Sequence, residues 1–346
     1  MIERSIDNNT RGGRLDKYLR RLLPGANSGF IYKMLRKKNI TLNGSKASGS
    51  EILEEGDVVR LFFSDETFGK FSVSKGAAEN MTAAGSDHID VIYEDNDVII
   101  LNKPAGILCQ KAKPEDISLN EELLSYLAGK GEITDESLST YTPSLVNRLD
   151  MNTSGLVLGA KTLSASRELS ELIKNRLIRK FYLCVVEGKF EEDSGVLKGY
   201  LVKDEDTNMV SVSPNRTCGA SYIETKYRVL GSAFGGSGTF GSSPASVGAG
   251  ESEAARGSVD ITLAEAELVT GKTHQIRAGF AAAGHPLLGD YKYGNGEYGG
   301  LRRQALHSYK VAFPKIMGSL SRLSFKEFTA PLPKDMEKLI SGAGIM

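Results

Sequence analysis

The sequence contains no long apolar run. A helix that crosses a membrane needs about 18 consecutive apolar residues, and no stretch of this chain approaches that length. Residues 1–7 also carry acidic side chains where a secretory signal would have its apolar centre. These absences exclude a protein anchored by helical spans and favour a cytoplasmic location.

Cysteine and histidine are scarce. The three cysteines, Cys109, Cys184 and Cys218, are far apart and odd in number, so neither a disulfide framework nor a zinc site follows from them. The four histidines also lack the short spacing of a metal-ligand set. We therefore predict buried or inert thiols and no metal.

An excess of charge is missing as well, because 43 basic residues balance 43 acidic ones. The distribution is nevertheless uneven. Residues 11–38 contain nine lysines and arginines and a single acid, Asp16. A local cluster of this kind attracts phosphates whatever the total charge is, so a nucleic-acid partner is not excluded.

The first 64 residues have the pattern of a small separate module. Apolar residues recur at helical spacing over 14–23, and Pro24-Gly25 ends that helix. Ser28 is positioned to cap a second helix. Short strands are predicted at 40–42 and 58–63, with the tight-turn pair Asn43-Gly44 after the first.

The basic residues of these helices fit either an ordinary solvated surface or a nucleic-acid-binding surface. The order of features over residues 11–64 resembles the alpha-L RNA-binding module named after a small-subunit ribosomal protein. The resemblance implies RNA binding by residues 1–64. It nominates six phosphate contacts: Arg14, Lys17, Arg20, Lys33, Arg36 and Lys37.

Composition divides the rest of the chain. Residues 65–88 are rich in Ser, Gly, Ala and Asp without an apolar period, which predicts a linker. Residues 89–340 alternate between strand and helix patterns, including a hairpin over 91–101 and an amphipathic helix over 163–178. Residues 231–257 are mostly Gly, Ser and Ala, which predicts a disordered insertion, although contact with RNA remains open.

Two polar clusters are candidates for chemistry. Residues 147–156 place Arg148, Asp150 and several small polar side chains before a buried strand, which suits either a capped turn or a functional site. Residues 268–277 read as a polar strand, in which Arg277 is a natural partner for a buried carboxylate. His274 alone is more typical of a structural histidine.

A relaxed phosphate-loop pattern over residues 266–273 is an alternative interpretation of the second cluster. The strict pattern needs a glycine at its first position and a flexible loop. Here the segment is strand-like, and Glu267 would repel phosphate. A nucleotide-dependent enzyme that uses Lys272 is therefore the weaker alternative, and it predicts that ATP protects the protein against thermal unfolding.

Several motifs together resemble the RluA-type family of RNA pseudouridine synthases. They lie, in the family's order, at 103–106 (KPAG), 148–150 (RLD), 153–156 (TSGL), 180–182 (KFY), 270–277 (TGKTHQIR), 284–286 (GHP), 289–290 (GD) and 306–307 (LH). The resemblance covers residues 90–332. Asn147 and the Ala278-Gly279 pair depart from the family pattern, which bears on the RNA target more than on the activity.

The resemblance implies an α+β fold with a mixed, mainly antiparallel sheet, and isomerisation of uridine without a cofactor or metal. Asp150 would be the catalytic carboxylate, either as a nucleophile on the sugar or as a base. Arg277 would hold that carboxylate ionised and oriented. Tyr182 would stack on the uracil, unless it is only an apolar strand residue. Arg148 would fill the RNA stack when the base leaves it, and Lys103 would contact phosphate.

The same resemblance favours large-subunit (23S-type) ribosomal RNA as the substrate. Transfer RNA remains an alternative substrate, and a non-catalytic RNA-binding or ribosome-assembly protein remains an alternative function. We expect a monomer.

Overall fold

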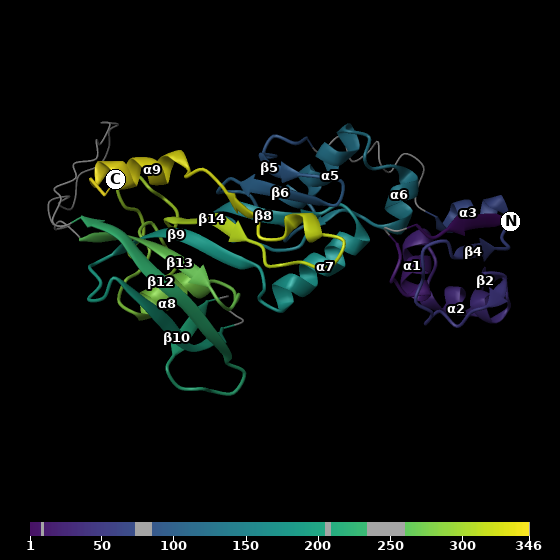
Figure 1. The fold of residues 1–346 in the computed structure, drawn as a ribbon, viewed down its shortest axis with the longest axis horizontal. Helices are drawn as coiled ribbons and strands as arrows, with labels where there is room; N and C mark the ends of the chain where they lie inside the picture. Colours follow the sequence, from purple (N-terminus) through teal and green to yellow (C-terminus); the bar gives the residue numbers. More distant parts are fainter. Residues whose placement is uncertain (8–9, 73–84, 205–208, 234–259, 346) are drawn as a thin grey trace.

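The structure, a computed structural model, describes residues 1–7, 10–72, 85–204, 209–233 and 260–345. Figure 1 shows an elongated molecule, with a small N-terminal module at one end and a long twisted sheet through the remainder. No helix within the described ranges is long and apolar enough to cross a membrane.

The N-terminal module packs two helices against a four-stranded antiparallel sheet of order β1-β4-β2-β3. Its elements are β1 (Ile2–Ser5), α1 (Leu15–Leu22), α2 (Ser28–Arg36), β2 (Ile40–Leu42), β3 (Ser45–Lys46) and β4 (Val58–Leu61). Leu15, Leu19 and Leu22 lie on one face of α1 and are buried, as their spacing predicts. The basic side chains therefore face outward on both helices.

Local turn chemistry sets the connections of this module. Asn43 (φ 51°) and Gly44 (φ 75°) both have positive φ, which is the geometry of the tight hairpin turn between β2 and β3. The cap of α2 differs from the prediction: the Asn27 side chain, and not Ser28, accepts a 2.8 Å hydrogen bond from the Phe30 amide. Asn27 precedes the first helical residue and has an extended backbone, so its side chain reaches the Phe30 amide, which has no partner within the helix.

The segment predicted as a linker begins with a helix. α3 (Asp65–Phe71) is capped by Ser64, whose hydroxyl accepts from the Thr67 amide at 3.2 Å. Phe68 and Phe71 pack against the core of the module. The prediction was wrong for residues 65–71 because two aromatic side chains are enough to dock one short helix; residues 73–84 lie outside the described part of the chain.

The second domain is built on one mixed, mainly antiparallel sheet of eleven strands, with the main order β11-β10-β12-β13-β9-β14-β8-β6-β5. The fold class expected from the resemblance is confirmed. The strands are β5 (Val91–Glu94), β6 (Val98–Lys103), β7 (Ser144–Leu145), β8 (Ser154–Ala160), β9 (Arg179–Glu187), β10 (Ser194–Lys203), β11 (Val210–Ser213), β12 (Ser221–Ala233), β13 (Ile261–Leu268), β14 (Leu306–Ala312) and β15 (Glu327–Thr329). β14 is parallel to β8 and antiparallel to β9, so it joins the two halves of the sheet.

One half of the sheet is covered on both faces. The helices beside it are α5 (Leu119–Gly129), α6 (Asp135–Thr140) and α7 (Leu163–Lys174). Val98 and Ile100 of β6 join the core under α7, whereas Ile99 and Leu101 join the core under α5. The run of apolar residues over 98–101 of β6 follows from this double burial.

The other half of the sheet carries α8 (Gln275–Ala282) against β10, β11 and β12, and α9 (Lys334–Gly342) near the C-terminus. The strand predicted over 268–277 was wrong. β13 ends at Leu268, a turn follows, and His274 in a left-handed conformation (φ 52°) precedes the helix. Residues 231–233 end β12, and the rest of the predicted insertion lies outside the described residues.

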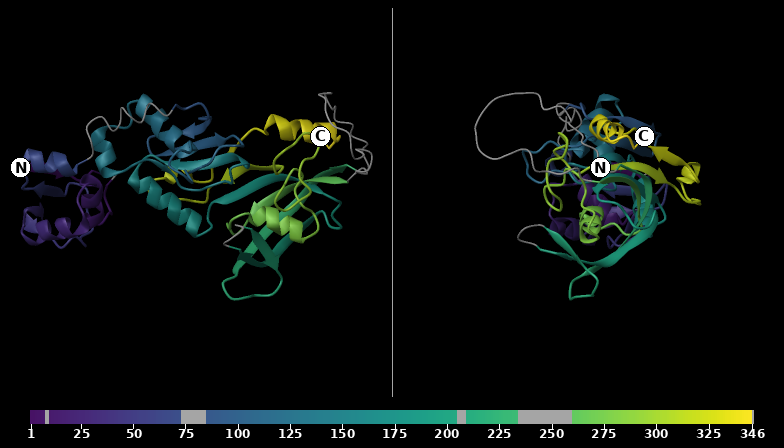
Figure 2. Two further views of the ribbon diagram at one scale, coloured as in Figure 1. Left: turned by 180° about the vertical axis from the view of Figure 1, so that it is seen from behind. Right: turned by 90° about the vertical axis from the view of Figure 1, so that its left-hand side faces the viewer.

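The N-terminal module contacts the second domain through α1, which lies against α6. Arg167 of α7 also donates a 2.8 Å hydrogen bond to the Arg11 carbonyl. The left-hand view of Figure 2 shows the same arrangement from behind, in which the module extends the molecule beyond the α7 end of the sheet.

Candidate active site

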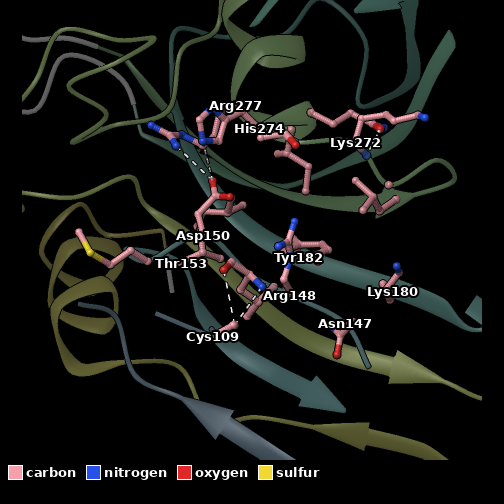
Figure 3. Close-up of a pocket in the computed structure, with 18 of the residues that line it drawn as sticks. Cys109, Asn147, Arg148, Asp150, Thr153, Lys180, Tyr182, Lys272, His274 and Arg277 are labelled. Carbon is pink, nitrogen blue, oxygen red and sulfur yellow. Dashed lines mark hydrogen bonds and ion pairs between the residues drawn. The ribbon is translucent and has the colours of Figure 1, made fainter. Parts of the chain in front are cut away.

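A cavity of about 670 Å³ lies where the two halves of the sheet meet. Its walls come from the turn that precedes β8, from β9, and from the turn that leads into α8 (Figure 3). Lys111, Arg148, Lys180, Lys272 and Arg277 are its basic lining residues, while Asp150 is the one acid among the described residues that line it. The cavity therefore suits a polyanion that must meet a single carboxylate.

The turn that carries Asp150 is held close to β14. The Thr153 amide donates to the Asp150 carbonyl at 3.0 Å, which closes the turn. Gly155 has φ +111°, and a Cβ atom there would lie 2.2 Å from the Ser308 carbonyl oxygen. Only glycine fits this position, because the backbones of β8 and β14 touch.

Asp150 points one carboxylate oxygen at a cation. Arg277 Nη1 donates to Asp150 Oδ2 at 3.1 Å, and His274 Nε2 lies 3.7 Å from the same oxygen (Figure 3). The Asp150 side chain is 29% exposed, so it remains open to the cavity. The structure thus brings together the carboxylate and the arginine that the sequence nominated from segments 127 residues apart.

Arg277 is itself fixed by a second carboxylate. Its Nε and Nη2 atoms donate to the two oxygens of Asp290 at 2.7 and 2.8 Å, and Asp290 is fully buried. Burial alone would raise the pKa of Asp290, but the hydrogen bonds and charge of Arg277 outweigh it and keep that pKa below its usual range. Because Asp290 binds the Nε and Nη2 edge of the Arg277 guanidinium, Nη1 of Arg277 points at Asp150.

Tyr293 and His274 complete the surroundings of this arginine. The Arg277 guanidinium lies 5.0 Å from the centre of the Tyr293 ring, and the Tyr293 hydroxyl is 2.8 Å from His274 Nδ1. Burial lowers the pKa of His274, opposed by the charge of Asp150. A neutral imidazole beside Asp150 follows at neutral pH.

Tyr182 lies on β9 at the floor of the cavity, 6% exposed. Burial raises its pKa to about 12. The phenol is therefore neutral at physiological pH, and its ring presents a flat apolar surface beside the carboxylate.

Arg148 is exposed at the mouth of the cavity. Within the described ranges no hydrogen bond or ion pair holds its guanidinium. A long, free cation two residues before Asp150 can reach into a bound nucleic acid.

Lys103 does not face the solvent, so its prediction as a phosphate contact was wrong. Its side chain is 0% exposed, and its ammonium group donates to the carbonyls of Pro104, Ile107 and Met151 at 2.8–2.9 Å. Burial lowers its pKa to about 8. Three carbonyls occupy all three of its donors, so Lys103 ties the loop after β6 to the Asp150 turn and leaves none for RNA.

The six basic residues nominated in the N-terminal module are all exposed on α1, α2 and their flanks. Arg14 differs from the others because its guanidinium donates to Asp16 at 3.0 and 3.3 Å. The pKa of Asp16 is lowered despite its burial, by hydrogen bonds from Arg14 and Tyr32. Arg14 is thus held in one orientation.

Sequence reasoning missed the roles of Asp290 and Tyr293. Both belong to a loop whose only signal was the pair Gly289-Asp290 followed by Tyr293-Gly294. Gly289 has φ +74° and no room for a side chain, since a Cβ would lie 2.1 Å from the Arg303 carbonyl oxygen. An acid directly after such a glycine was the available hint of a buried partner.

Comparison with known proteins identifies the family and the fold. Residues 97–282, more than half of the chain, match the family described as RNA pseudouridylate synthase, and residues 13–59 match the S4 domain. This chain is similar to the solved structure titled Human RNA Pseudouridylate Synthase Domain Containing 4, with a TM-score of 0.51 and 17% sequence identity. The superposition covers 78% of this chain and 96% of the human chain, so the two share a fold.

Curated relatives extend over most of the chain. An uncharacterized RNA pseudouridine synthase of Mycoplasma pneumoniae is 30% identical over 96% of this chain and 95% of its own length. A ribosomal large subunit pseudouridine synthase C of Rickettsia bellii is 32% identical over 83% of this chain and 85% of its own. The Vibrio parahaemolyticus protein of the same name is 27% identical over 97% of this chain and 95% of its own. With a family match over more than half of its residues and relatives of this similarity, the chain belongs to the RNA pseudouridylate synthase family, an RNA-modifying isomerase family.

Proposed function

We propose that this protein converts uridine to pseudouridine in large-subunit ribosomal RNA, with Asp150 as the catalytic carboxylate. The observation that carries the proposal is the position of Asp150, the one acid among the described lining residues of a basic cavity, 3.1 Å from Arg277 and with its other oxygen free. The relatives named for the large ribosomal subunit support this choice of RNA.

The free oxygen of Asp150 defines two chemical routes. Oδ2 is occupied by Arg277, so Oδ1 is the atom that meets the ribose. It either attacks the anomeric carbon as the glycosidic bond breaks, or removes a proton from the neighbouring sugar carbon. In both routes the released uracil turns within the cavity and its carbon 5 bonds to the anomeric carbon. In the first route the bond between Asp150 and the sugar breaks as this bond forms, and in the second Asp150 returns the proton to the sugar carbon. The proton that leaves carbon 5 is balanced by the proton gained at nitrogen 1 of the uracil, so no atom is lost overall.

The surrounding residues divide the remaining tasks. Arg277, clamped by Asp290, holds Asp150 in one orientation. The neutral Tyr182 ring stacks on the uracil and holds it while it turns. Arg148 occupies the gap that the flipped uridine leaves in the RNA, which offsets part of the few kcal/mol that flipping costs.

The N-terminal S4 module supplies affinity for the RNA backbone. Lys17, Arg20, Lys33, Arg36 and Lys37 project from its two helices and attract phosphates without reading sequence. We expect the enzyme to act as a monomer in the cytoplasm.

The test is a deletion of the gene in its host, followed by chemical mapping of pseudouridine in ribosomal and transfer RNA. We expect specific large-subunit sites to vanish, and the wild-type gene to restore them. Asp150→Ala, and the isosteric Asp150→Asn, should restore none while binding RNA normally. Sites lost only from transfer RNA would overturn the choice of substrate; rescue by either variant would overturn the role of Asp150; and no lost site at all would indicate a binding protein.

A further inference from the structure

Lys180 lines the active-site cavity but belongs to none of the interactions described above. It lies on β9 two residues before Tyr182, so both side chains leave the same face of the strand, about 7 Å apart along it. Figure 3 shows both side chains on the same wall of the cavity, with Lys180 on the side away from Asp150. Its side chain is partly covered, and burial lowers its pKa.

No acid compensates this lysine. In the described part of the chain no hydrogen bond or ion pair involves its ammonium group. Its neighbours differ: Arg179 pairs with Glu267 at 2.8 Å, and the Lys310 ammonium lies 4.3 Å from the Phe181 ring on the other face of β9. A partly buried cation without a partner lowers the stability of the fold. A structural role would therefore not explain why a lysine occupies this position.

The atoms around Lys180 favour an anion from outside the protein. A Cβ added at Gly271 would lie 3.8 Å from Lys180 Nζ, so the ammonium group borders the turn that carries Lys272. Two lysines thus flank this part of the cavity, while Asp150 lies beyond Tyr182. With the sugar of the target uridine at Asp150 and its base on Tyr182, an RNA strand that continues along the cavity from that sugar would bring a neighbouring backbone phosphate near this pair.

We propose that Lys180 binds the RNA backbone phosphate adjacent to the target uridine and so positions that nucleotide over Tyr182. The inference rests on the proposed function, since it assumes an RNA substrate whose uridine enters this cavity. Lys180 is a positioning residue here, because it touches the substrate away from the bond that breaks.

The first experiment compares Lys180→Met with wild type in single-turnover reactions on the ribosomal RNA fragment that carries the mapped uridine, at several KCl concentrations. We expect the half-saturating enzyme concentration to rise about tenfold or more at low salt, as for loss of one charge-assisted bond. The slope of log affinity against log salt should fall by about 0.7, the value for one phosphate of a single strand. Lys180→Arg should keep the slope. Lys310→Met is the matched control, since Lys310 is a lysine of the neighbouring strand β14 that lies over the Phe181 ring on the other face of the sheet.

A second experiment locates the phosphate. A neutral methylphosphonate is placed in turn on the 5′ and 3′ sides of the target uridine. At one position we expect the wild type to lose affinity about tenfold and Lys180→Met to lose none. Equal losses for both proteins at both positions, or an unchanged salt slope, would refute the proposal.

Stability separates this role from a structural one. Lys180→Met should unfold at the same temperature as wild type or higher, because a costly cation has been removed; a clear fall would indicate a structural lysine and overturn the inference. Failure of the proposed function looks different, since wild type itself would then form no pseudouridine in the fragment.

Discussion

Replacement of Asp290 by alanine should damage both the stability and the activity of the enzyme. Asp290 is fully buried and accepts two hydrogen bonds from Arg277, at 2.7 and 2.8 Å, and two from backbone amides, at 2.8 and 3.2 Å. Removal of one partner of a buried ion pair costs about 3–5 kcal/mol, because the other charge stays buried. At about 2–4 °C per kcal/mol for a domain of this size, the melting temperature should fall by roughly 6–20 °C.

A double variant separates stability from catalysis. Arg277→Met combined with Asp290→Leu replaces the buried pair with apolar side chains of similar volume, a change that is often neutral or stabilising. Most of the melting temperature should return. Turnover should not return, because Asp150 would lose the cation that orients it, and we expect a loss of about 100-fold or more.

The assay is the release of tritium from RNA labelled at carbon 5 of uridine, alongside thermal unfolding followed by circular dichroism. Asp335→Ala is the matched control, since Asp335 also forms a two-bond pair with an arginine, Arg303, but is 45% exposed. It should cost less than about 1 kcal/mol. A similarly small cost for Asp290→Ala, or full activity in the double variant, would refute the reasoning.

Three further outcomes follow from features of the fold. Gly155→Ala should lower the free energy of unfolding by about 3 kcal/mol or more, because it adds backbone strain at φ +111° to a clash with the Ser308 carbonyl. Gly279→Ala in α8 is the control: nothing lies within 4 Å of the new Cβ, so it should be neutral or stabilising by up to about 1 kcal/mol. Burial lowers the pKa of His307 from 6.5 to about 4, so the unfolded chain binds the proton first. The stability that neutral His307 provides is complete above pH 6.5 and disappears as pH falls toward 4, by about 3 kcal/mol, and denaturant titrations of wild type and His307→Gln should differ in that window. Glutamine replacement of the basic face of α2 should weaken RNA binding and lower the salt slope by about 2, whereas an unchanged slope in filter binding would exclude this face from the RNA contact; the three residues are Lys33, Arg36 and Lys37.

The sequence allowed the prediction of features that depend on local pattern. The helices of the N-terminal module follow from apolar spacing, and the Asn43-Gly44 turn follows from the positive φ that hairpins require. The mixed sheet could be expected only from several motifs taken together. In each case a residue type at a given spacing has one dominant physical meaning.

Features that depend on distant contacts could not be predicted in this way. A lysine in a polar motif is usually exposed, and only the fold reveals that three carbonyls surround Lys103. Residues 268–277 have the polar alternation of a strand, but the left-handed conformation of His274 starts a helix there. The ion pair between Arg277 and Asp290 joins a helix to a loop, and no periodic pattern of residues in the sequence indicates such a contact.

The end-on attachment of the S4 module determines how long a substrate must be. The module lies beyond α6 and α7, whereas the cavity lies between β9 and α8 (Figures 1 and 2). An RNA that engages both has to extend along the molecule, so a short oligonucleotide gains only the contacts of the cavity. Effective concentration then favours RNAs whose folded shape presents a second phosphate-rich element at the correct separation, and discrimination among uridines depends on RNA architecture as much as on the bases beside the target.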